Sequence, residues 1–169
     1  MRRWVAATTT TALLLALASG CSDTADSTRL PAPRQAPATA LGADVSSLDT
    51  GDYVIYFNTF TTDQLSPEIA RSYGITRGQR RVLVNVSVLK KNGDGLATPV
   101  KAEVVSNVAN LSAQRKDLSF REIDEGGEAV YYIAELPVSS TETLMIELDV
   151  TPENETASQY LKFRRTFKF

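Results

Sequence analysis

The chain has 169 residues, with 18 Lys and Arg, 20 Asp and Glu, one Cys, one Trp and no His. Without imidazole, it cannot build a catalytic triad or dyad that uses His, or a His-ligated zinc site. One Cys also excludes an internal disulfide and a Cys-rich metal site, and a net charge of −2 gives no basic surface for nucleic acid. We therefore expect a non-enzymatic protein without catalytic residues, metal, cofactor or nucleic-acid partner.

The N-terminus has the pattern of an export signal. Two arginines at positions 2 and 3 precede an apolar run over residues 12–18, and Ser19 and Gly20 then lead into Cys21. The apolar run is shorter than the roughly 20 residues that a transmembrane helix needs. Residues 17–21, LASGC, resemble the lipobox of bacterial lipoproteins, in which the Cys becomes the first mature residue and carries the acyl chains. This predicts a lipoprotein signal peptide over residues 1–20 and lipid attachment at Cys21.

The segment after Cys21 is expected to be a tether. Residues 21–47 are rich in Ser, Thr, Ala, Pro and Asp and contain no aromatic residue, a composition that buries too little surface to become ordered. We predict a disordered tether over residues 21–47 and a folded domain over residues 48–169. Ser22 resembles the residue that permits transfer to the outer membrane. The expected location is therefore the periplasm, with the lipid anchor in the outer rather than the inner membrane.

From Leu48 onward, apolar and polar residues alternate and turn signals recur about every ten residues, which is the spacing of an all-β domain. The expected strands are residues 53–60, 81–88, 100–108, 118–122, 129–136, 143–150 and 160–169. Asn-Gly and Asp-Gly pairs at residues 92–95 predict a hairpin turn between the second and third of these strands. In the strand over residues 143–150, Glu147 and Asp149 are expected to face water.

Seven short strands without a helical crossover predict an immunoglobulin-like antiparallel β-sandwich. The alternative is a closed eight-stranded ligand barrel. One short helix interrupts the strands, because Ser66 is a good N-cap and Pro67 suits the first helical position. Ile69 and Tyr73 are four residues apart and are expected to form its buried stripe.

Aromatic residues and arginines gather at the front of the domain, and the sequence allows two interpretations of them. The cluster comprises Tyr53, Tyr56, Phe57, Phe60, Arg77, Arg80 and Arg81. Such a combination can form a recognition surface. The other interpretation is that Tyr56 and Phe60 fill the sandwich core while the arginines line a solvated strand entrance.

Two asparagines, Asn58 and Asn85, lie in mid-strand positions, where Asn is unfavourable. We expect their side chains to hydrogen-bond the helix segment or a bulge; the alternative is that they bind a ligand. The candidate interaction surface is therefore Tyr56, Asn58, Tyr73, Arg77 and Asn85. Acidic residues around positions 124–128 and 149–155 lack the pattern of a calcium loop, so we expect solvated turns there.

Several segments resemble one known family. They are Gly51-Asp52-Tyr53, Phe57-Asn58, residues 65–70 (LSPEIA), Tyr73-Gly74-Ile75 and residues 84–88 (VNVSV). In this order they resemble the domain-of-unknown-function 4426 family of small exported gammaproteobacterial proteins, from about Asp49 to Phe169. The resemblance implies a periplasmic β-sandwich and supplies no activity, so it implies no catalytic residue. Asn58, Tyr73 and Asn85 fall within its recurring patterns.

These observations favour a lipid-anchored envelope domain that binds another envelope protein, through an exposed sheet edge or the aromatic and arginine face around the short helix. The alternative is a domain that binds a small apolar or glycan ligand between the sheets or at one end of the sandwich. A purely structural role in the envelope is the third possibility.

Overall fold

The computed structural model describes residues 39–42 and 45–169; the predicted signal peptide, Cys21 and residues 22–38 of the predicted tether lie outside the described residues. The described residues form eleven strands, one α-helix and one 3-10 helix. These are β1 Thr39–Ala40, β2 Ser47–Asp49, β3 Tyr53–Thr61, η1 Thr62–Gln64, α1 Pro67–Ser72, β4 Arg81–Lys91, β5 Ala97–Pro99, β6 Ala102–Asn110, β7 Arg115–Lys116, β8 Arg121–Asp124, β9 Val130–Pro137, β10 Thr141–Pro152 and β11 Gln159–Lys168.

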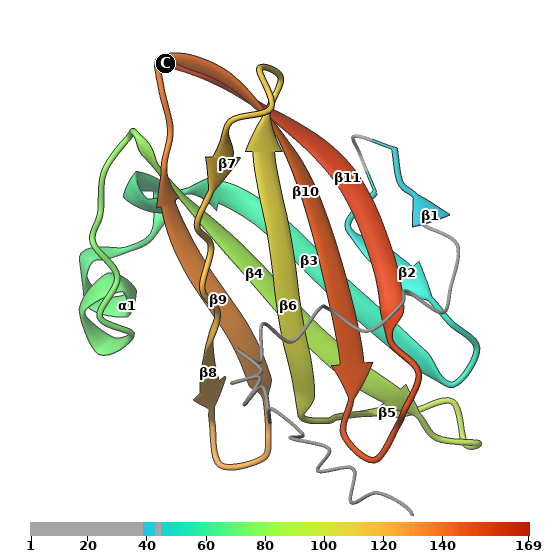
Figure 1. Ribbon diagram of the computed structural model, residues 1–169. Helices are drawn as coiled ribbons and strands as arrows, with labels where there is room; N and C mark the ends of the chain where they lie inside the picture. Colours follow the sequence, from blue (N-terminus) through green and yellow to red (C-terminus); the bar gives the residue numbers. More distant parts are fainter. Residues whose placement is uncertain (1–38, 43–44) are drawn as a thin grey trace, which may run out of the picture. The chain divides into compact units, whose positions relative to one another are not determined.

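The strands form two sheets that face each other (Figure 1). One has the order β1-β11-β10-β6-β7, and the other has the order β2-β3-β4-β9-β8 with β5 paired to β4. All neighbours are antiparallel except β1 and β11, which run parallel. The predicted antiparallel β-sandwich with one short helix is confirmed, and the strands do not close into the alternative barrel.

All seven predicted strands are present, as β3, β4, β6, β8, β9, β10 and β11, and two details differ. The strand that returns from the hairpin turn after β4 is the short β5, whereas β6 crosses to the other sheet and pairs with β10. β8 begins at Arg121 rather than Leu118. Leu118 and Phe120 pack against the sandwich core without belonging to a strand. Single-strand periodicity shows which residues face inward, but it does not reveal which sheet a strand joins.

Alternate residues of the long strands fill the space between the sheets. Val82, Val84, Val86 and Val88 of β4 are all fully buried, and Phe57 of β3 packs on Phe163 of β11 with ring centroids 4.6 Å apart. Because side chains on a strand alternate between two faces, the inward set of β3 is Tyr53, Ile55 and Phe57. Tyr56 lies on the opposite face and is 46% exposed, so the interpretation that Tyr56 fills the core is wrong.

The beginning of the described chain passes from one sheet to the other. Thr39 and Ala40, which fall in the predicted tether, pair with Leu161 and Lys162 of β11. A few residues later, β2 pairs with β3 in the other sheet. Only a short part of β11 is covered in this way.

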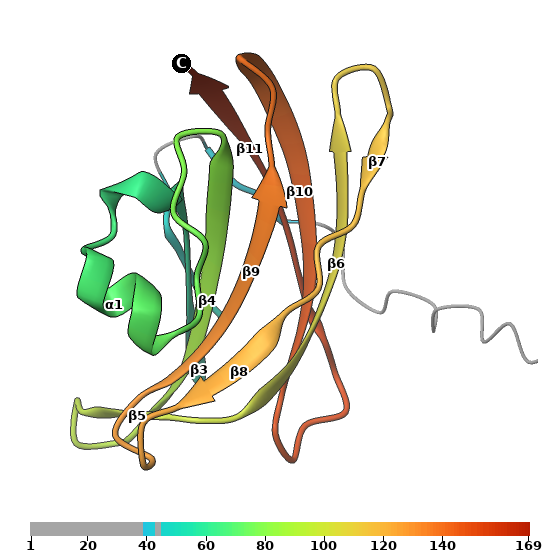
Figure 2. The same cartoon turned by 90° about the vertical axis from the view of Figure 1, so that its left-hand side faces the viewer.

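Helix α1 lies on the outer face of the second sheet, on the side away from β6 and β10 (Figure 2). Ser66 caps it as predicted, since its hydroxyl accepts the N–H of Ile69 at 3.2 Å. The predicted buried stripe is half wrong: Ile69 is 45% exposed, and Ala70 is the residue buried against the sheet. Tyr73 is the C-cap, and its backbone is no longer α-helical. A four-residue spacing therefore does not place the side chains of Ile69 and Tyr73 on one helix face. Within the described part of the chain, no helix is long and apolar enough to cross a membrane.

Candidate functional site

Residues 62–80, which include η1 and α1, form a cover segment over part of the outer face of the second sheet. Beneath it lies a second apolar cluster in which Ala70 and Ile75 of the cover segment meet Leu83 of β4 and Ile133 of β9. Phe60 packs against this cluster, so it too lies outside the sandwich core that one interpretation assigned to it. The cover segment therefore buries apolar side chains on the outer face of this sheet, while the inner face packs against the other sheet.

Polar contacts fasten the cover segment at its start. Thr62 is fully buried; its hydroxyl donates to the carbonyl of Thr76 at 2.9 Å and accepts the N–H of Gly78 at 2.9 Å. Arg77 donates to the carbonyl of Asp63 at 2.8 Å. The two ends of the segment are thus joined to each other, and Arg77 serves this internal contact.

A second fastening holds the end of α1 to the β8–β9 hairpin. The Tyr73 hydroxyl donates to the carboxylate of Glu125, and Arg121 of β8 donates to the Tyr73 carbonyl. The hydrogen bond to the Glu125 carboxylate raises the pKa of Tyr73 above its ordinary value. Gly126 and Gly127 adopt positive φ in this hairpin, a conformation that glycine permits. These contacts attach Tyr73 and the end of α1 to the β8–β9 hairpin.

The uncovered part of the same face presents a cluster that we call the Tyr56 patch: Tyr56, Asn58, Asn85 and Ser87. In the register of β3 and β4, Asn58 lies directly opposite Asn85, and Tyr56 lies directly opposite Ser87. Tyr56 and Asn58 are exposed, and the other two are half-buried. Four neighbouring side chains thus offer an aromatic ring, two amides and a hydroxyl, with no charge among them.

The two asparagines neither cap the helix nor support a bulge, so that expectation is wrong. The Oδ1 atom of Asn58 accepts the N–H of Thr59 at 2.8 Å, within its own strand. The Oδ1 atom of Asn85 is buried and has no hydrogen-bond partner among the described residues. Because a buried polar atom without a partner costs free energy, this oxygen is the least satisfied group of the patch.

Of the five residues predicted as an interaction surface, the fold brings together Tyr56, Asn58 and Asn85. Tyr73 and Arg77 belong to the cover segment, where each is tied to a specific partner. The sequence analysis did not select Ser87, although it is an outward-facing polar residue of the regular strand β4. Its position opposite Tyr56 follows only from the strand register.

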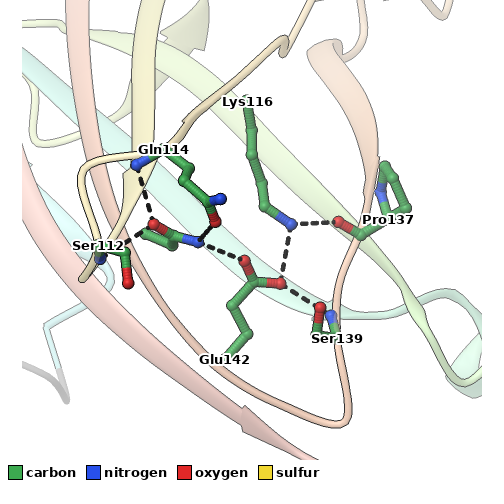
Figure 3. A network of polar contacts seen from close by, with 7 residues as sticks. Ser112, Gln114, Lys116, Pro137, Ser139 and Glu142 are labelled. Atoms are coloured by element: carbon green, nitrogen blue, oxygen red, sulfur yellow. Dashed lines mark hydrogen bonds and ion pairs between the residues drawn. The ribbon is translucent and has the colours of Figure 1, made fainter.

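A buried carboxylate that the sequence did not single out lies near the far ends of β6 and β10 (Figure 3). Glu142 is 7% exposed; it accepts Lys116 Nζ at 2.8 Å and the Ser139 N–H at 2.8 Å. Lys116 also donates to the carbonyl of Pro137 at 2.9 Å. Burial acts to raise the pKa of Glu142, but the hydrogen bonds from Lys116 and Ser139 outweigh it, and the net shift is downward. This network joins the β6–β7 hairpin to the β9–β10 turn.

The chemistry available at the Tyr56 patch is recognition by stacking and by amide and hydroxyl hydrogen bonds. Among residues 39–42 and 45–169, no group of three carboxylate or thiol residues is placed to hold a metal ion. Glu125 and Glu135, which contact the cover segment, are engaged with Tyr73, Thr76 and Arg81.

The sequence and structure match one family. Its model, described as a domain of unknown function, DUF4426, matches residues 47–168. The chain belongs to the DUF4426 family. The matched range begins at the first residue of β2 and ends at the last residue of β11, so the DUF4426 domain comprises the cover segment and every strand except β1.

A solved structure of another family member agrees with this assignment. A DUF4426 family protein from Pseudomonas aeruginosa PAO1 is similar, with 28% identity and a TM-score of 0.61 over 72% of this chain and 93% of that chain. FetP from uropathogenic E. coli strain F11 has 11% identity and a TM-score of 0.46 over 73% of this chain and 91% of that chain, a likeness too low to indicate shared function. A search of curated proteins finds no match.

Proposed function

We propose that this DUF4426 domain is held in the periplasm by lipid at Cys21 and acts by binding another envelope protein, without catalysis of its own. The signal pattern and lipobox over residues 1–21 support the location and the anchor. Two or three acyl chains hold a protein stably on a membrane, and Ser22 after the acylated Cys favours the outer membrane. A composition without His supports a binding role over an enzymatic one.

The observation that carries the binding role is the Tyr56 patch. The patch combines an exposed tyrosine with two amides, one of which has a buried oxygen without a partner among residues 39–42 and 45–169. Such a surface can anchor a protein contact. The cover segment beside it is fastened at both ends, so binding here needs little ordering of the free protein. A site between the sheets has less support, because Phe57 and Phe163 fill that space.

The test is site-specific photocrosslinking in living cells. A photoreactive amino acid placed at Tyr56 or Asn58 should give the same crosslinked envelope protein, and Asn85→Asp should weaken that crosslink. The matched control is Leu111, which is 69% exposed in the β6–β7 turn and should give no such product. Identical products from positions 56 and 111, or none from either patch position, would count against the patch as the binding surface.

A further inference from the structure

Among the described residues, no strand pairs with most of one edge of β11. β11 pairs with β10 along its whole length, but β1 covers it only at Leu161 and Lys162. Antiparallel partners exchange hydrogen bonds at alternate residues. The Phe169 N–H donates to Ser140 on the β10 side, and the Lys162 carbonyl accepts from Leu41 on the β1 side. The peptide groups of the even-numbered residues Arg164, Thr166 and Lys168 therefore point to the side of β1, where the Arg164 carbonyl already accepts Arg165 Nη1 at 3.0 Å. We call this stretch the free edge.

The free edge is basic although the domain is acidic. Residues 48–169 contain 14 basic and 17 acidic side chains. Residues 159–168 contain Lys162, Arg164, Arg165 and Lys168 and no acidic residue. Lys162 is paired with Glu147 at 2.9 Å, and Arg165 lies over the Phe163 ring and donates to the Val45 carbonyl at 2.7 Å. Arg164 and Lys168 are exposed, and within the described residues neither has an ion-pair partner.

The three even-numbered side chains also share one face of the sheet, because side chains alternate along a strand. Arg164 and Lys168 are separated by four residues, or about 13 Å at ~3.3 Å per residue. Thr166 lies between them and hydrogen-bonds Thr143 of β10 at 2.9 Å. A strand added to this edge would place its own residues opposite Arg164 and Lys168 four positions apart.

A second copy of the chain is a poor occupant of the free edge. Antiparallel pairing of two β11 strands centred on Thr166 would put Arg164 of each copy opposite Lys168 of the other, and like charges directly opposite each other are destabilising. A partner with two acidic residues four positions apart in an extended segment places a carboxylate beside each cation and can pair with the outward peptide groups of Thr166 and Lys168.

We infer that the free edge of β11 binds an extended acidic segment of another envelope protein as an added β-strand, with two Asp or Glu four residues apart facing Arg164 and Lys168. The inference rests on the proposed function in one respect, that the partner is a protein of the envelope. The contact itself is separate from the Tyr56 patch. β1 already adds to the same strand in this way, with the Leu41 N–H donating to Lys162 at 2.9 Å.

The test uses the full chain in detergent and fluorescent heptapeptides, read by fluorescence anisotropy. The first peptide is Thr-Glu-Val-Thr-Val-Glu-Thr, with its acids four positions apart. The second has the same composition in the order Thr-Glu-Val-Thr-Glu-Val-Thr, with its acids three positions apart and hence on opposite faces. We expect the first peptide to bind at least tenfold more tightly. Equal affinity would show that charge alone attracts the peptide and would overturn the inference, as would no binding of either.

Variants of the chain distinguish peptide binding through backbone hydrogen bonds from peptide binding through charge alone. Arg164→Glu with Lys168→Glu should weaken the first peptide at least tenfold, whereas Arg115→Glu, an exposed cation of β7, should not change it. Thr166→Pro removes an N–H from the free edge and should also abolish binding. In case that variant does not fold, the first peptide with alternate N-methyl groups tests the same hydrogen bonds on the wild-type chain and should not bind.

Two controls test whether binding occurs at the free edge and whether the partner is a peptide and not a lipid surface. Tyr56→Ala should bind the peptide like wild type, so a failure of the Tyr56 patch and a failure of the free edge give different results. Vesicles of phosphatidylglycerol and phosphatidylcholine test a lipid surface as the alternative. If vesicles bind in a way that Arg164→Glu abolishes and Thr166→Pro does not, the basic edge recognises membrane charge and the inference is wrong.

Discussion

The contribution of the Thr62 hydrogen bonds to stability can be measured by making the same substitution, Thr→Val, at Thr62 and at nearby Thr59. The Thr62 hydroxyl is fully buried and hydrogen-bonds Thr76 and Gly78, whereas the Thr59 hydroxyl is buried and has no hydrogen-bond partner in the described part of the chain. Valine has nearly the shape of threonine, so each Thr→Val change removes the hydroxyl while conserving volume and β-branching. The two variants differ chiefly in whether hydrogen bonds are lost.

Thr62→Val should lower the free energy of unfolding by about 1–3 kcal/mol, because it leaves the Gly78 N–H without its partner at the interior. The Thr76 residue is exposed, so water replaces part of the loss at its carbonyl. Thr59→Val should be neutral or stabilising by up to about 1 kcal/mol, since it removes a polar atom that is buried and unpaired. For a domain of this size, each kcal/mol corresponds to a shift in Tm of roughly 3–5 °C.

The assay is urea unfolding followed by far-UV circular dichroism, because the one tryptophan, Trp4, lies in the predicted signal peptide. Equal slopes with different midpoints would show that stability alone has changed. If Thr62→Val and Thr59→Val shift the urea midpoint by the same amount, the hydrogen bonds of Thr62 do not stabilise the cover segment, and our explanation is refuted.

Three further predictions address the core, the pH dependence and the anchor. Phe57→Ala should cost about 3–5 kcal/mol in the same urea titration, because it opens a cavity in the buried core, whereas Tyr56→Ala should cost less than about 1 kcal/mol; similar losses would contradict the assigned faces of β3. Burial acts to raise the pKa of Glu147, but hydrogen bonds from Lys162 and Asn107 outweigh it and lower the pKa to about 2 from an ordinary 4.5. Its ionised form therefore stabilises the fold above pH 4.5, and this contribution is lost as the pH falls toward 2; Glu147→Gln should flatten the loss of Tm over that range, and an unchanged profile would refute the assignment. Cys21→Ala should abolish labelling by an alkyne palmitate analogue and release the protein into the soluble periplasmic fraction; continued labelling would place the acyl group elsewhere.

Strand periodicity predicts which residues of this domain face inward. It does not predict the exposure of an outward residue that a neighbouring side chain covers. Leu144, Ile146, Leu148 and Val150 alternate perfectly and are all fully buried. Glu147, between them, was expected to face water and does point outward, yet its side chain is only 14% exposed because it pairs with Lys162 of the next strand. Alternation distinguishes two faces of a strand, but neighbouring strands decide how much water each face meets.

The candidate site was predicted in part for the same reason. Residue type alone identified these three residues: Asn58 and Asn85 because Asn is depleted in strands, and Tyr56 because aromatic residues near arginines can form a recognition surface. It could not show that the two asparagines lie opposite each other, because cross-strand register depends on the hairpin and on the buried set of each strand. Tyr73 and Arg77 share the aromatic and cationic character of the cluster, but their backbone belongs to the cover segment and their side chains are committed to its fastening.

One irregularity in β4 explains why the outer face of this sheet is divided in two. The run Val82-Leu83-Val84 breaks the alternation, and Leu83 is buried on the face opposite the valines. A strand with apolar residues on both faces must be covered on both faces. The cover segment meets this need at Leu83 and Ile133, and it ends where the outward residues of β4 become Asn85 and Ser87. The transition from Leu83 to Asn85 along one strand therefore marks the boundary between the part of the face that packs within the domain and the part that we propose as the binding surface.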